Sequence, residues 1–234
     1  MIKGIQNLSR EDIELKVIEV IEYFRKEILD HPCATPILEF VQQLQKEDKI
    51  IIDLTKDLGN TNKGIKIVGL FNLKPRGIYI DMSLINDNRF NFTLSHEIGH
   101  LVLHRKLTFK QEEYEGIQDT EYDMISGKHI LKTDRDWIEW QANYFGSAFL
   151  MPKQTFIEAV RQIQDRMGII RNQGMIYLDN TSSSIRDFEH IKGELKKIYI
   201  VNVTNIEIRI NDLGILNDQR LKNVNHISRL FREE

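Results

Sequence analysis

The sequence has a single cysteine, Cys33, among its 234 residues. One thiol excludes a framework of internal disulfide bonds, and we interpret Cys33 as a small buried side chain in a protein of a reducing compartment. The sequence also lacks any apolar run long enough to span a bilayer, and its first residues lack the apolar stretch of a signal peptide. These absences predict a cytoplasmic protein with no membrane partner.

The sequence shows no large excess of one charge. Its 32 Lys and Arg residues face 35 Asp and Glu residues, for a formal net charge of −3. This balance excludes a global electrostatic attraction to nucleic acid. The hydrophobic fraction of 41% and the charged fraction of 29% are ordinary for a globular protein. The length suits one medium domain with a small addition.

Apolar spacing predicts helices in most of the chain and strands in one part of it. Ser9 caps a first helix that ends near Pro32, and a second helix follows Pro36. The runs KIIIDL, IKIVGLF and RGIYIDMSL are rich in β-branched residues and predict a small three-stranded meander. Further helices are predicted at about 88–103, at 134–150, after Pro152, and twice in the tail after residue 178; residues 105–133 are acidic and predict a long loop.

The stretch TLSHEIGHLVLH, residues 93–104, carries the clearest chemistry. On a helix, His96 and His100 are four residues apart and share one face, so both imidazoles can reach one metal ion. Glu97 then lies beside the ion, where a general base can take a proton from water whose pKa zinc lowers to about 7. H-E-x-x-H is a short pattern, and two ordinary histidines on a buried helix are the alternative. Apolar Leu94 and Ile98 favour a helix anchored in a core.

A catalytic zinc site needs a third protein ligand. The metzincin arrangement is excluded, because Leu103 and Lys106 stand where that class has glycine and histidine. His104 lies two helical turns from His96, about 12 Å along the axis, which is too far to share an ion. We therefore interpret His104 as a polar residue at the helix end or as a partner of a ligand.

Glu139, on the helix that begins near residue 134, is the predicted third ligand. Asn143 lies four residues later on the same face, where its amide oxygen can accept the free N–H of a metal-bound histidine. Competing carboxylates lie in the acidic loop, where rigid presentation is harder: Glu112, Glu113, Glu115 and Glu121.

With both motifs, FTLSHEIGHLVLH and EWQANYFGSAFLMP, the sequence resembles the ImmA/IrrE family of zinc metallopeptidases. Glu139, Ala142, Asn143 and Phe145 match the second motif of that family. Gly146 stands where the family usually has alanine, and Phe149 where it has leucine. The resemblance implies a zinc-dependent, site-specific cytoplasmic endopeptidase that cleaves a regulatory protein. In the family this is commonly a helix-turn-helix repressor, often in mobile elements or stress responses.

The expected fold is α+β. It comprises a zincin-like minimal metallopeptidase core with a small three-stranded sheet and several helices, plus a C-terminal helix-turn-helix-like appendage. The expected domains are N-terminal helices over 1–45, the metallopeptidase domain over 46–177 with its acidic insert at 105–133, and a helical region over 178–234. The strand GIYIDMSL is a candidate edge strand for an extended substrate.

Some assignments stay open at this level. Tyr114, Tyr122 and His129 in the insert are candidate donors to the oxyanion of the reaction. The alternative function is a non-catalytic zinc-containing regulator that binds a partner protein or DNA. Direct DNA binding is disfavoured because residues 185–234 hold nine Lys or Arg against eight Asp or Glu, a net of +1.

Overall fold

The computed structural model describes residues 5–48, 50–61, 64–73, 76–105, 118–120 and 133–220. Within them the chain is α+β, as predicted. The N-terminal half holds α1 (Arg10–Arg25), η1 (Lys26–Leu29), α2 (Ile37–Asp48), β1 (Ile51–Asp53), β2 (Ile67–Leu73), β3 (Arg76–Ile80), η2 (Met82–Leu84), α3 (Phe90–Leu103) and β4 (Gln118–Thr120). The C-terminal half holds α5 (Asp134–Leu150), α6 (Lys153–Arg166), β5 (Ile176–Leu178), α7 (Ser182–Tyr199), α8 (Val203–Asp212) and β6 (Leu216–Asp218).

The three predicted strands are present, but their order differs from a meander. The sheet runs β1-β3-β2-β4, with β1 parallel to β3 and the other pairs antiparallel. The connection between β1 and β2, residues 54–66, is much longer than a hairpin loop, so β2 is not forced to lie beside β1. Because β3 lies between β1 and β2, the interpretation of GIYIDMSL as an edge strand is wrong.

The short strand β4 comes from the insert predicted as a loop. It adds to the free side of β2, with Asp119 opposite Gly69. The rest of that insert, including the candidate donors Tyr114, Tyr122 and His129 and the glutamates Glu112, Glu113, Glu115 and Glu121, lies outside the described residues.

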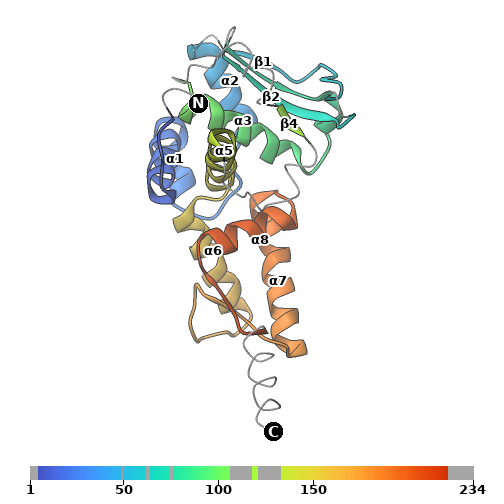
Figure 1. Ribbon diagram of the computed structural model, residues 1–234. Coiled ribbons are helices and arrows are strands. Elements are labelled where there is room, and N and C mark those ends of the chain that lie inside the picture. The colour runs from blue at the N-terminus through green and yellow to red at the C-terminus, as the bar shows by residue number, and fades with distance from the viewer. Residues whose placement is uncertain are drawn as a thin grey trace.

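Helix α3 runs through the centre of the upper half, between the sheet and α5 (Figure 1). Eleven of its fourteen residues are buried, because it has neighbours on both sides. The crossing of α3 and α5 is close: a Cβ at Gly99 would lie 3.0 Å from the Ala142 carbonyl oxygen, and one at Gly146 would lie 3.0 Å from the His96 backbone nitrogen. Glycine at these positions lets the two backbones approach, which brings side chains of α5 over the histidines of α3.

Helices α6, α7 and α8 lie on the side of α5 away from the sheet (Figure 1). The predicted tail helices are present, and the parallel pair β5-β6 was not predicted because each strand has only three residues. Arg209 of α8 is fully buried and donates to the Met151 carbonyl and to both carboxylate oxygens of Glu14 on α1. The tail therefore packs into the same core as the N-terminal helix.

Within the described part of the chain, no helix combines the length and the apolar character that crossing a membrane requires.

Candidate metal centre

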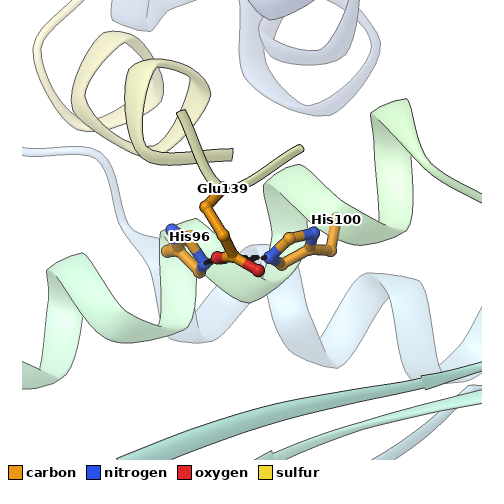
Figure 2. A group of neighbouring side chains, drawn as sticks. All are labelled: His96, His100 and Glu139. Atoms are coloured by element: carbon orange, nitrogen blue, oxygen red, sulfur yellow. Dashed lines mark hydrogen bonds and ion pairs between the residues drawn. The ribbon is translucent and has the colours of Figure 1, made fainter. Parts of the chain in front are cut away.

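Three side chains from two helices meet at one point in the α3–α5 crossing. His96 and His100 come from successive turns of α3, and Glu139 reaches down from α5 (Figure 2). Glu139 Oε2 lies 3.3 Å from His96 Nε2 and 3.5 Å from His100 Nε2, and the two Nε2 atoms are 2.9 Å apart. The structure thus brings together the three residues that the sequence suggested as metal ligands.

The donor set and its spacing fit a tetrahedral metal ion. Ligand atoms about 2.0–2.1 Å from a tetrahedral zinc ion lie roughly 3.3 Å from one another, which is close to both carboxylate–imidazole distances here. Glu139 Oε1 is buried and has no hydrogen-bond partner among the residues that the structure describes. A buried carboxylate oxygen without a donor is costly, so a cation at this point would satisfy it.

The helix capping explains why Glu139 lies at this level of α5. Thr133 and Asp136 form a capping box that fixes the start of the helix, and Glu139 follows one turn later. Burial alone raises the pKa of Glu139, but the two imidazoles beside it outweigh burial and hold the pKa well below its usual range. The carboxylate is therefore ionised at neutral pH, as a metal ligand must be.

Asn143 holds the first histidine in one tautomer. Its Oδ1 lies 2.9 Å from His96 Nδ1. An amide oxygen only accepts, so Nδ1 carries the proton and Nε2 keeps its lone pair. That lone pair faces Glu139 and His100, which is the arrangement a metal ligand requires.

Glu97 is completely buried next to the histidines, but it is not part of the three-residue cluster. Its carboxylate lies against β2 at Gly69, where an added Cβ would be 2.3 Å from Glu97 Oε1. Two residues further along the same face of β2, the Phe71 ring stacks on the His100 ring with centroids 6.2 Å apart. Strand β2 therefore forms the floor of the site, and a glycine in it leaves room for the carboxylate.

His104 is buried at the end of α3 and does not join the cluster. Its Nδ1 lies 2.9 Å from His100 Nδ1, and its Nε2 lies 3.0 Å from Gln141 Oε1. Burial, with a further contribution from His100, lowers the pKa of His104 to about 3, so the ring is neutral at physiological pH.

Trp137 and Trp140, which flank Glu139 in the sequence, pack edge to face on each other.

Sequence reasoning missed Gly69 and Gln141. Gln141 lies between Glu139 and Asn143 on α5. The sequence did not identify it, because no periodic pattern marks a polar side chain that contacts the end of another helix. Gly69 was hidden because a glycine in a β-branched run gives only a weak signal of close approach.

Residues 60–172 match the family model described as Peptidase_M78, the IrrE N-terminal-like domain. The match covers the sheet strands β2 and β3, α3 with its two histidines, and all of α5. It ends before α7, so it does not bear on the predicted helix-turn-helix character of α7 and α8, which stays a prediction. No curated protein matches the chain. Residues 60–172 therefore form an IrrE N-terminal-like domain of the ImmA/IrrE peptidase family.

Proposed function

We propose that this protein is a zinc-dependent endopeptidase that makes a specific cut in a regulatory protein. The observation that carries the proposal is the convergence of His96, His100 and Glu139, with Glu97 buried beside them. Two imidazoles and one carboxylate are a ligand set of catalytic zinc sites, which keep a further position open.

Each residue has a distinct part in this proposal. His96, His100 and Glu139 would hold the ion, which supplies Lewis acidity for polarising a peptide carbonyl and for lowering the pKa of water. Glu97 would accept the proton of the attacking water on its carboxylate and pass it to the leaving amine nitrogen. Asn143 would keep His96 in the tautomer that presents Nε2.

The substrate class rests on the resemblance to the family. A helix-turn-helix repressor in the cytoplasm is the substrate we propose, and the protein would then act in a mobile element or a stress response. The tail supports a protein partner more than DNA, because α8 uses Arg209 and its apolar face for internal packing.

Replacing Glu97 by Gln tests the catalytic part of the proposal. The amide cannot accept a proton, so kcat should fall by about 10²–10⁴-fold while the metal site, made by other residues, retains zinc. New protein N-termini should be sought in host cells that express the wild type, Glu97→Gln, or the control Glu22→Gln, a similar change at an exposed position on α1.

A discrete new terminus that appears with wild type and control but not with Glu97→Gln supports the proposal and names the target. The same terminus with all three chains would exclude Glu97 as the base. No new terminus, combined with a zinc-loaded chain that binds a host protein, would favour the non-catalytic regulator instead.

A further inference from the structure

A chain of four hydrogen-bonding groups leads from the metal centre to the N-terminal segment. His100 Nδ1 lies 2.9 Å from His104 Nδ1, and His104 Nε2 lies 3.0 Å from Gln141 Oε1. Gln141 Nε2 donates to the backbone carbonyl of Gln6 at 2.7 Å. His100, His104 and Gln141 are all buried, so water does not replace these partners. We call this series the His100–Gln6 chain.

The direction of every hydrogen bond in the chain follows from its last member. The Gln6 carbonyl only accepts, so the group of Gln141 that faces it must be the NH₂, and the Gln141 oxygen must face His104. That oxygen also only accepts, so His104 carries its proton on Nε2. A neutral imidazole has one N–H, which leaves His104 Nδ1 as an acceptor.

The acceptor role of His104 also fixes the position of the proton on His100. Because His104 Nδ1 accepts, His100 Nδ1 must donate, and its proton lies on Nδ1. His100 Nε2 is then left with a lone pair that faces His96 Nε2 and Glu139. The reverse tautomer would place a proton where a metal ion must bind.

We propose that His104 and Gln141 are positioning residues that hold His100 in its metal-binding tautomer, with the direction of the chain set by the Gln6 carbonyl. This inference rests on the proposed function, since it assigns a purpose to the His100 lone pair. His104, Gln141 and Gln6 together would support His100 as Asn143 supports His96. Gln6 belongs to the segment that precedes α1. The His100–Gln6 chain also gives residues before α1 a part in a site formed by α3 and α5.

The tautomer of His104 can be measured directly in the full-length protein. Long-range ¹H–¹⁵N correlations of the metal-free, ¹⁵N-histidine-labelled chain should show His104 protonated on Nε2 and bare on Nδ1. In Gln141→Met, which lacks both the accepting oxygen and the donating NH₂, His104 should no longer occupy a single tautomer. A wild-type His104 protonated on Nδ1 would overturn the proposal.

Zinc affinity, measured by competition with a chelator, gives the second readout. His104→Phe removes the acceptor for His100 Nδ1–H and should weaken zinc binding by about 10–100-fold. His104→Asn places an amide oxygen near the position of Nδ1 and should restore most of that affinity. Leu101→Ala, a change at a buried apolar position of α3, should lower stability and leave the affinity unchanged.

An unchanged affinity in His104→Phe would contradict the proposal, as would an equal loss in His104→Asn, because His104 would then act only through packing. A wild-type protein that shows the expected His104 tautomer but binds no zinc would contradict the proposed function. The hydrogen bonds of the His100–Gln6 chain would still stand as described.

Discussion

At the scale of single residues, the site depends on how closely Glu97 lies to the floor of the sheet. Glu97 follows His96 directly on α3, yet its carboxylate extends to β2, where Gly69 has no side chain to oppose it. Any larger residue at 69 would meet the carboxylate or the Thr93 methyl, which lies 3.0 Å from the same point. The position of the proposed base is therefore set partly by a glycine on another element.

Gly69→Ala should consequently impair catalysis more than metal binding. The new methyl would displace the carboxylate of Glu97, and a displacement of about 1 Å costs up to 10²-fold in rate. The rate at which the enzyme cleaves its protein substrate should fall at least tenfold, while its zinc affinity should stay close to that of the wild type. Gly193→Ala on α7 is the matched control, because a Cβ there meets nothing within 4 Å. Equal turnover in the two variants would show that Gly69 does not position the base.

The convergence of these side chains could be predicted from sequence because a helix converts spacing into geometry. His96 and His100, and likewise Glu139 and Asn143, are four residues apart, so each pair shares a face whatever the rest of the fold does. Gln141 and Gly69 could not be found this way. Their roles depend on which helix end and which strand lie opposite them, and that is a property of tertiary structure.

At the scale of elements, the strand-rich runs indicated the sheet but not its order. Each run predicts a strand from its own β-branched residues, while the order depends on which strands the connections allow to meet. The parallel β1-β3 pair and the addition of β4 to β2 are contacts between segments far apart in sequence. The helices were easier to predict, since capping residues such as Ser9 and Pro152 mark their starts locally.

Asp81 secures the segment between β3 and α3. Its buried carboxylate caps η2 by accepting from Ser83, and it also accepts from the Leu58 amide and pairs with Lys66 at 3.0 Å. Burial raises the pKa of Asp81, but these donors outweigh burial and hold the pKa far below its usual range. The segment that leads into α3 thus depends on an ionised carboxylate.

Asp81→Asn should lower the free energy of unfolding by on the order of 2 kcal/mol at pH 7, because hydrogen bonds to a charged acceptor are lost. The folded pKa is below the unfolded value of about 3.9, so the contribution is complete above that pH and is lost as pH falls. Denaturant titrations from pH 7 down to pH 3 should therefore show the wild type and Asp81→Asn converging in acid. A constant difference across that range would refute the account of Asp81.

At the scale of the whole molecule, an ion pair between the buried Arg209 and the partly buried Glu14 joins the N-terminal helix, the core and the tail. Arg209 of α8 makes a two-point contact with Glu14 of α1, at 2.7 and 3.1 Å, and Glu14 also accepts from Tyr144 of α5 at 2.9 Å. These contacts link the three regions that the sequence suggested as separate domains, 1–45, 46–177 and 178–234. Strand β5 spans the boundary between the last two. Sequence patterns gave no sign of this because the three residues are far apart in the chain.

Arg209→Leu should lower the free energy of unfolding by about 3–5 kcal/mol, since it leaves the largely buried Glu14 carboxylate without its counter-charge. The double variant Glu14→Gln with Arg209→Leu should recover part of that loss, because the uncompensated charge is gone. Chemical denaturation of the two variants and the wild type measures both effects. A loss below about 1 kcal/mol in the single variant would mean that the contact does not hold the tail to α1.

Zinc content after dialysis tests most directly whether His96, His100 and Glu139 hold one zinc ion. The wild type and Glu97→Gln should each retain one zinc per chain, because Glu97 is not a proposed ligand. Glu139→Ala should lose most of its zinc while its far-ultraviolet circular dichroism stays that of the folded wild type. A folded Glu139→Ala chain with full zinc content, or a wild type that retains none, would contradict the account.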